Sequence, residues 1–405
     1  MATQKVRTFD SQKTILWVSP IILDTHLHKE LLLNTLRQLE ELGHDTSLIA
    51  MRSKYASRTE SSSMHTISVP LRYAPVISPL IFASALFLFL PIYIIKSKPD
   101  FVIMDPDVSI LSSIPSLLVS RFKKMRFVLD VRSTPVEAVG LRGFLTKFWF
   151  SASVLVAKKL FHGITIITPL MKKEVCDSFD INPDKVGVWT SGVSASLFDP
   201  KNCISQAKEL RRRLGLSGNF VVFYHGVFTA TRGLAETMKA VGILKRKYPR
   251  IVLFLLGRGP MLPAMKELMH ADGLGDNVVI HDPVPHTEVP KFIRMCDVCI
   301  VPLPYHPYWR FQCPVKLLEY LAMEKVIIAT DIPAHRSIIS EGKCVIYVSS
   351  IKPTEIARSI EYAYNNKEKL EQWGECGRTV IIENYTLEKV ARDLSGYLLS
   401  IDDRL

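Results

Sequence analysis

The apolar segment FVVFYHGV in the second half of the chain contains a glycine, and an arginine follows it. Gly226 stands near the end of this segment, and Arg232 and Gly233 open the helical pattern that comes next. Amides at the start of a helix attract phosphate, and a guanidinium binds phosphate through paired hydrogen bonds. The segment therefore predicts a phosphate site with Arg232 as its first ligand. Taken alone, the motif fits a glycine turn with a solvated arginine equally well.

Two further segments add polar groups to the same region. FLLGRGP repeats the arrangement of a strand followed by glycines, and Arg258 is expected at the same edge of the sheet. In FQCPVKLLEYLA, Pro314 opens a helix, Lys316 lies in its first turn and Glu319 follows on the same face. A lysine is unfavourable there because the amino end of a helix already carries positive partial charge. A bound diphosphate would compensate for it, and Glu319 is expected to accept hydrogen bonds from a ribose.

The elements that must position these residues are short apolar strands that alternate with helical patterns. This alternation predicts parallel sheets with crossover helices, and hence an α/β fold. The pattern stops at the loop GVSASLFDPKN and begins again at NFVVFYHGV. We expect an N-terminal Rossmann-like domain over 1–200, a C-terminal one over 201–380, and a terminal helix within 381–405 that packs back toward the first. Open parallel sheets bind ligands beyond the carboxyl ends of their strands, so the expected site is a cleft between the two domains.

These motifs resemble the retaining glycosyltransferases of the two-Rossmann GT-B fold, in the group called family 4 or glycosyl transferases group 1. The resemblance covers almost the whole chain, and the segments that carry it are LEELGH, KPDFVIMDPD, GVSASLFDP, RGL, GRGP, PVKLLEYLA and the terminal helix. PVKLLEYLA, followed by a strand that ends in Asp331, is the most specific of them. The resemblance implies two Rossmann-like domains that face each other across a cleft. It also implies transfer of a sugar, with retention of configuration, from a nucleotide diphosphate donor to an acceptor hydroxyl.

By this resemblance Glu319 corresponds to the second glutamate of the family's two-glutamate motif and would bind the ribose. The sequence departs from the family at the first glutamate, which normally contacts the donor sugar, because Phe311 stands there. Val227 stands where many members have an arginine. Arg232 and Lys316 are then expected to bear most of the diphosphate charge. The other expected donor-binding residues are Gly226, Arg258, Phe311 and Pro314.

The first half offers weaker candidates for the acceptor side. Arg132 follows a strand, where the family often has a histidine or an aspartate that faces the cleft; a surface arginine is the alternative. His26 and His28, together with Asp24, lie in the loop after the first strand, a position that looks toward the acceptor. Each of these two histidines is alternatively a hydrogen-bonded structural residue. We expect Arg132, His26 and His28 on the acceptor side.

Asp105 and Asp107 have the spacing of a carboxylate pair that could bind a metal ion. Two carboxylates alone rarely hold Mg²⁺. The enzymes that this sequence resembles neutralise the leaving diphosphate with protein cations and helix amides. We therefore interpret the pair as part of a loop turn, and we expect no metal and no cofactor besides the nucleotide sugar as substrate.

The composition excludes a disordered chain and a disulfide scaffold. The 405 residues are 48% hydrophobic and 22% charged, which suits two globular domains. The seven cysteines are scattered with no repeated pair, so we expect a reducing, cytoplasmic location. A net charge of +12 points to phosphate-rich partners. No zinc-finger spacing or ribonucleoprotein motif accompanies the charge, so we expect no nucleic-acid partner.

Most of the positive charge lies beside the longest apolar run. Between Met51 and Lys173 stand 17 Lys and Arg against 6 Asp and Glu, with a dense patch, RFKKMR, at 121–126. The run Pro79–Ile95 is at the lower limit of length for a bilayer span, and Pro91 interrupts it. A buried or interfacial helix is favoured over one that dips into the membrane surface or spans it. We expect peripheral contact with the cytoplasmic face of a membrane through this basic first domain.

The function expected from these observations is transfer of a sugar to a lipid-linked or membrane-proximal acceptor, as in surface polysaccharide or glycolipid assembly. Two alternatives stay open. A nucleotide-sugar epimerase on the same fold would convert the donor without an acceptor. A non-catalytic GT-B binding or scaffold protein would bind the donor without turnover, and the missing first glutamate is compatible with this. Consumption of the donor with and without acceptor separates the three.

Overall fold

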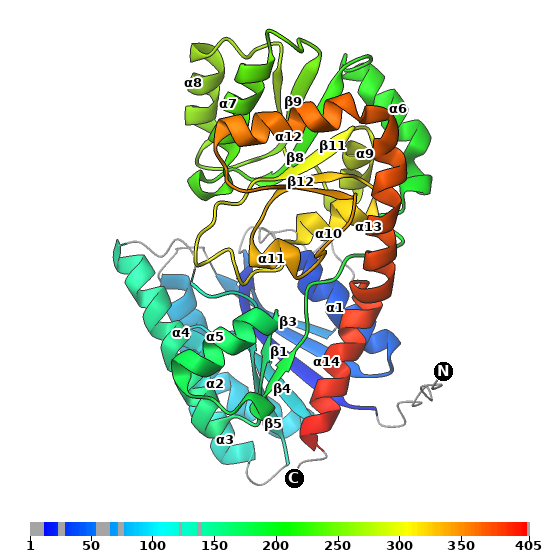
Figure 1. Cartoon of the computed structure of the whole chain (residues 1–405). Coiled ribbons are helices and arrows are strands. Elements are labelled where there is room, and N and C mark those ends of the chain that lie inside the picture. The colour runs from blue at the N-terminus through cyan, green and yellow to red at the C-terminus, as the bar shows by residue number, and fades with distance from the viewer. Residues whose placement is uncertain are drawn as a thin grey trace. The chain divides into compact units, whose positions relative to one another are not determined.

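The computed structural model describes residues 12–22, 29–53, 65–71, 77–120, 124–135 and 140–402. The chain divides into two units, Met1–Thr190 with Leu387–Leu405, and Ser191–Thr386 (Figure 1). The predicted boundaries at 200 and 380 therefore lie inside the second unit. The reason is that the segment after Thr190 bonds within that unit, where the Val193 amide donates to the Tyr385 carbonyl at 2.9 Å.

The first unit is built on a seven-stranded sheet in the order β3-β2-β1-β4-β5-β6-β7, and its paired strands are parallel. The order reverses between β1 and β4. Branched apolar residues fill these strands because helices cover both faces of the sheet. The strands are β1 (Thr14–Ile22), β2 (Asp45–Ser53), β3 (His65–Leu71), β4 (Phe101–Met104), β5 (Arg126–Val131), β6 (Gly163–Ile166) and β7 (Val186–Val188).

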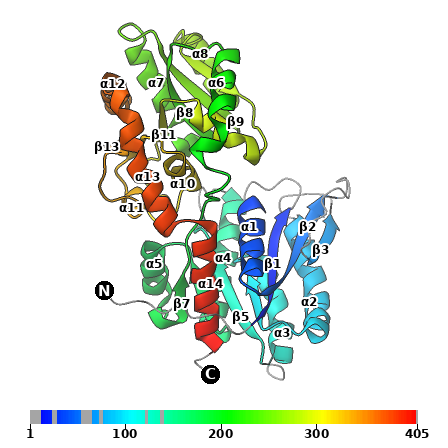
Figure 2. The same cartoon turned by 90° about the vertical axis from the view of Figure 1, so that its right-hand side faces the viewer.

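Helices of the first unit separate into two groups. In one group, α1 (Lys29–Glu41) and the terminal helix α14 (Leu387–Asp402) pack on the core that contains Trp17. In the other group, α2 (Ile77–Ser97) packs against η1 (Val108–Ser112) and α3 (Ser113–Ser120), and α4 (Gly140–Leu160) packs against η1. Figure 2 shows α2 and α3 side by side. The remaining elements are α5 (Pro169–Phe179) and η2 (Pro183–Lys185).

Glycines in two strands let the terminal helix lie close to the first sheet. A Cβ on Gly187 would come within 2.4 Å of the Tyr397 ring, and one on Gly163 within 2.5 Å of Ile401. The Tyr397 hydroxyl accepts a hydrogen bond from the Ile164 amide at 3.2 Å and donates to the Lys185 carbonyl. The last helix of the chain is thereby part of the first unit.

The second unit contains a six-stranded parallel sheet in the order β10-β9-β8-β11-β12-β13. Its order reverses between β8 and β11, and ligands of such sheets bind beyond the carboxyl ends of the strands at this switch point. The strands are β8 (Phe220–Val227), β9 (Ile251–Arg258), β10 (Val278–His281), β11 (Val298–Val301), β12 (Ile327–Thr330) and β13 (Val345–Val348).

The helices of the second unit connect these strands in turn. They are η3 (Pro200–Cys203), α6 (Ile204–Arg213), η4 (Ala230–Arg232), α7 (Leu234–Leu244), α8 (Leu262–Ala271), η5 (His286–Glu288), α9 (Val289–Arg294), α10 (Val315–Ala322), α11 (Pro333–Arg336), α12 (Pro353–Asn365), η6 (Lys367–Lys369) and α13 (Leu370–Asn384). The α7 and α12 helices cover the core cluster beneath β8 and β9. Residues after β8, β10 and β11 form the candidate site.

Candidate functional site

The carboxyl ends of β8 and β9 approach each other so closely that only glycine fits between them. Gly226 and Gly257 are paired in register, and Gly257 has φ +154°. A Cβ on Gly257 would lie 2.0 Å from the Gly226 carbonyl oxygen, and one on Gly259 would lie 2.3 Å from the Phe228 carbonyl oxygen. The two glycine motifs of the sequence are therefore one structure, in which the turn after β9 rests on the backbone of β8.

Lys316 lies directly over this glycine edge. It stands in the first turn of α10, and its Nζ is 3.8 Å from the centre of the Tyr224 ring. A Cβ on Gly226 would come within 2.9 Å of the same Nζ. Burial, together with the charge of Arg232, lowers the pKa of Lys316 well below its usual value. An anion next to the amine would reverse this shift, because it favours the charged form.

Arg232 is the second cation of the site. It ends η4, just before Gly233, whose φ of +67° turns the chain into α7. Its guanidinium lies 4.3 Å from the centre of the Trp309 ring. Its Nε is buried without a hydrogen-bond partner among the described residues. Since an unpaired buried donor costs free energy, this atom indicates a missing acceptor.

Glu319 lies one turn further along α10, and histidines hold both of its oxygens. His225 Nε2 is 2.8 Å from Oε2, and His286 Nε2 is 2.7 Å from Oε1. Burial raises the pKa of Glu319, but the hydrogen bonds and charges of His225 and His286 outweigh it and bring the pKa to about 2. The site therefore presents an ionised carboxylate beside two cations.

Glu319 and Tyr320 together fix the tautomer of His225. The Tyr320 hydroxyl accepts a hydrogen bond from the His225 amide at 3.0 Å, and the same oxygen lies 3.0 Å from His225 Nδ1. Because the ionised Glu319 carboxylate can only accept, the imidazole proton is on Nε2, and Nδ1 of the neutral ring then accepts from the Tyr320 hydroxyl. Burial lowers the pKa of His225, which favours this neutral form.

The structure thus brings together three residues singled out in the sequence, Arg232, Lys316 and Glu319, with Gly226 beneath them. The sequence interpretation missed His225 and His286. His225 stands immediately before Gly226, so the glycine motif after β8 could have pointed to it. His286 follows β10 in a segment without any motif that marks it.

The other predicted donor-side residues lie around this group in different ways. Pro314 is the residue that caps α10, which begins at Val315. Phe311 is buried, and the Arg310 guanidinium lies 4.4 Å from the centre of its ring. Arg258 is exposed at the end of β9 and pairs with Asp282 at 2.9 Å. Its guanidinium is thus engaged at the surface, and the structure does not pair it with the Lys316–Glu319 group.

Of the acceptor-side candidates, only Arg132 lies within the described residues. Its guanidinium lies 3.9 Å from the centre of the Trp189 ring and donates to the Trp189 carbonyl at 2.9 Å. Asp24, His26 and His28 lie outside the described residues. Arg132 therefore has a packing role in the first unit, whatever else it contacts.

The Asp105–Asp107 pair has local partners. Trp17 Nε1 donates to Asp105 at 3.3 Å, and the Ser19 hydroxyl donates to its other oxygen. Asp107 caps η1 by accepting from the Ser109 amide at 3.1 Å, as the loop-turn interpretation predicts. Burial raises the pKa of Asp105 to about 7 and that of Asp107 to about 6. Among the described residues, no group of three or more His, Cys, Asp and Glu is placed to hold a metal ion.

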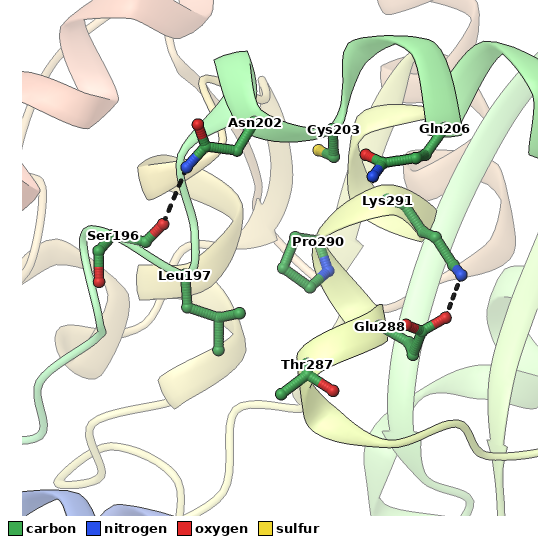
Figure 3. A pocket seen from close by; sticks show the side chains of 9 residues that line it. All are labelled: Ser196, Leu197, Asn202, Cys203, Gln206, Thr287, Glu288, Pro290 and Lys291. Carbon is green, nitrogen blue, oxygen red and sulfur yellow. Dashed lines mark hydrogen bonds and ion pairs between the residues drawn. The ribbon is translucent and has the colours of Figure 1, made fainter.

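A separate pocket borders the turn that carries His286 (Figure 3). It lies between the 196–206 segment and α9, and a Glu288–Lys291 ion pair closes one side. It does not include Arg232, Lys316 or Glu319. The residues that line it are Ser196, Leu197, Asn202, Cys203, Gln206, Thr287, Glu288, Pro290 and Lys291.

Comparison with known proteins finds a family model that matches most of the second unit. Residues 206–380 match the family described as glycosyl transferases group 1. An alpha-D-kanosaminyltransferase of Streptomyces kanamyceticus is 24% identical over 204 residues, which cover 50% of this chain and 52% of that protein. The chain spans about half the length of the curated relatives that head the comparison.

Solved structures match nearly the whole chain. A glycosyltransferase from Rickettsia africae ESF-5 has a TM-score of 0.75 at 18% identity, over 97% of this chain and 100% of that one. Anabaena Alr3699/HepE in complex with UDP and glucose has a TM-score of 0.74 at 12% identity, over 96% and 100%. Likeness at this level of identity shows the fold and confirms the α/β, GT-B prediction. The chain therefore has the GT-B fold, and its residues 206–380 are similar to the glycosyl transferases group 1 family.

Proposed function

We propose that this protein is a retaining glycosyltransferase that moves a sugar from a nucleotide diphosphate donor to an acceptor hydroxyl. The observation that carries the proposal is the pair of half-buried basic side chains at the switch point of the second sheet, Lys316 without a carboxylate partner in the described part of the chain and Arg232 with a buried, unpaired Nε. Two such cations beside each other raise their own free energy, and a diphosphate would relieve this.

The chemistry requires stabilisation of the departing diphosphate. As the bond from the sugar carbon to the phosphate oxygen breaks, its electron pair goes to the diphosphate, where Lys316 and Arg232 stabilise the charge. The acceptor oxygen bonds to the same face of the sugar carbon, and its proton goes to the leaving phosphate. We propose that these protein cations serve in place of a metal ion.

Glu319 is proposed to bind the ribose of the donor. An ionised carboxylate accepts hydrogen bonds from two neighbouring hydroxyls, and its pKa of about 2 keeps it ionised at any physiological pH. UDP is the first nucleotide to test, because the structurally similar Anabaena protein was crystallised with UDP and with UDP-glucose.

A thermal-shift screen with UDP, GDP, ADP and dTDP and their sugars, in the presence of EDTA, tests this proposal. We expect one nucleotide to raise the melting temperature of the native protein and to have no effect on Glu319→Ala. Glu267→Ala, on the exposed face of α8, is the matched control and should respond like the native protein. No stabilisation by any nucleotide would contradict the proposal and favour a non-catalytic scaffold, whereas donor consumption without acceptor would favour an epimerase.

We further propose that the acceptor is lipid-linked and that the first unit contacts the cytoplasmic face of a membrane. The support is the distribution of exposed large hydrophobic residues: of the 21 in the described part of the chain, 16 lie on α2, η1, α3 and α4. These elements pack against one another, as described above. Monomeric proteins rarely expose so many neighbouring apolar side chains without a partner.

The α2 helix shows why a bilayer is the proposed partner. Its buried residues form one stripe against the first unit, while its opposite face remains apolar; they are Ser78, Phe82, Ala83, Leu86, Leu90 and Ile94. It is long and apolar enough to cross a membrane by length and composition. The buried stripe favours a helix that lies in the interface instead. Exposed lysines, Lys96 in the last turn of α2, Lys98 just after it, and Lys147 and Lys159 on α4, complement anionic lipid.

Vesicle co-sedimentation tests the membrane proposal. The native protein should sediment with phosphatidylglycerol-containing vesicles, and the double variant Leu88→Glu, Ile92→Glu should remain in solution, because these side chains are 72% and 56% exposed on α2. Ile243→Glu, at a residue 52% exposed in the second unit, should bind like the native protein. The proposal fails if the double variant still binds, or if the apolar face instead joins two copies and the variant converts a dimer to a monomer.

A further inference from the structure

The two histidines that hold Glu319 differ in how firmly they are fixed. The His225 side chain is 14% exposed, its ring stacks on Phe223 at 5.8 Å, and Tyr320 contacts both its ring and its amide. The His286 side chain is 39% exposed and belongs to η5, a single 3₁₀ turn. Its ring contacts Phe198 at 5.3 Å. One partner of the carboxylate is therefore built into the core, and the other lies at the surface.

The two histidines and the burial of Glu319 leave little of its carboxylate open to a ribose. The Glu319 side chain is only 4% exposed, and a hydroxyl must come within about 2.5–3.0 Å of a carboxylate oxygen to donate to it. Some neighbour must move to open this approach. His225 is held by Phe223 and Tyr320 in the core, whereas the His286 side chain is 39% exposed on a single turn, so His286 is the histidine that we expect to move.

The surroundings of η5 leave room for such a movement. Thr287 and Glu288, which complete the turn, line the pocket of Figure 3. Leu197, just before Phe198, lines its other side. The turn that carries His286 thus has open space next to it instead of a packed core.

We propose that His286 is a displaceable cover on the ribose-binding carboxylate. Without donor, its Nε2–H occupies Oε1 of Glu319; when the donor binds, a ribose hydroxyl takes that position and the His286 ring turns to solvent. This inference rests on the proposed function, because it assigns the ribose to Glu319. The exchange replaces one hydrogen bond by another, and His286 acts as a competitor that sets donor affinity, without contacting the reacting atoms.

Calorimetric titration with UDP and with 2′,3′-dideoxyuridine diphosphate tests the sign of this effect. Removing the competitor in His286→Ala should raise UDP affinity about three- to tenfold, which corresponds to one net hydrogen bond. The affinity for the dideoxy nucleotide should not change, because it has no hydroxyl to take the place of His286. His286→Gln, whose amide can still donate to Glu319, should bind UDP with an affinity between those of the native protein and His286→Ala. The control is His270→Ala, at an exposed position near the end of α8, which should bind both nucleotides like the native protein.

The outcomes separate the two proposals. If UDP binds the native protein and Glu319→Ala abolishes binding, but His286→Ala leaves UDP affinity unchanged or lowers it, the cover is refuted and His286 is a structural residue or a ligand of the bound state. An equal gain for both nucleotides would also refute the cover, since general loosening of the site would produce it. If UDP binds neither the native protein nor His286→Ala, and none of the screened nucleotides binds either, the proposed function itself fails.

Discussion

Replacing Lys316 with methionine should lower kcat/KM for the nucleotide-sugar donor by about 10²–10³, the usual effect of removing one group that stabilises charge in a transition state. Methionine keeps the volume over the Tyr224 ring and removes only the charge. In the free protein, burial and Arg232 disfavour the charged amine. The developing negative charge of the diphosphate favours it, so the interaction strengthens as the sugar leaves. Initial rates with the nucleotide sugar that the thermal-shift screen selects measure this effect.

A binding comparison shows whether the loss comes from the diphosphate. Lys316→Met should weaken the binding of UDP and leave that of uridine unchanged. Lys266→Met, an exposed position on α8, should leave both unchanged. A variant with native kcat/KM, or one that loses uridine and UDP affinity equally, would show that Lys316 is a packing residue of α10 and would remove the main support for the diphosphate site.

The positions of Arg232, Lys316 and Glu319 could be predicted because they depend on local pattern. Each follows an apolar strand or opens a helix at a spacing that the sequence displays, and a parallel sheet brings the carboxyl ends of its strands to one edge. The same reasoning gave the α/β fold. Lys316 at the start of α10 was the most informative residue. A positive side chain is unfavourable at the amino end of a helix, and the first turn of this helix has no acidic residue to compensate for it.

The remaining features depend on contacts between segments that no local pattern relates. His286 reaches Glu319 from a turn after β10, and nothing in PHTE marks it. Arg258 stands in a glycine turn of the kind that often binds phosphate. Its guanidinium instead forms an exposed ion pair with Asp282, which follows β10. The segment after Thr190 belongs to the second unit, where the Val193 amide bonds to the carbonyl of Tyr385, which is almost the whole length of that unit away in sequence.

The site also depends on glycines that carry no functional group. Gly226 leaves space for the Lys316 amine, Gly233 turns the chain from Arg232 into α7, and Gly257 lets β9 approach Gly226. A Cβ on Gly233 would lie 2.1 Å from the Pro302 carbonyl oxygen. The close approach of backbones at this edge is therefore what brings both cations to the same place.

Gly257→Ala should consequently destabilise the second unit by about 2–5 kcal/mol, the sum of overpacking and of a backbone conformation unfavourable for L-residues. The new Cβ would lie 2.0 Å from a backbone oxygen that cannot move without separating β8 from β9. Hydrogen exchange of the β8 and β9 amides in urea measures the loss. Gly215→Ala, with φ +69° and open space, should show the backbone cost alone, and Gly275→Ala, with no neighbour within 4 Å, should be close to neutral. Equal losses for Gly257→Ala and Gly215→Ala would mean that β9 does not press on β8, and Lys316 would then need another explanation for its position.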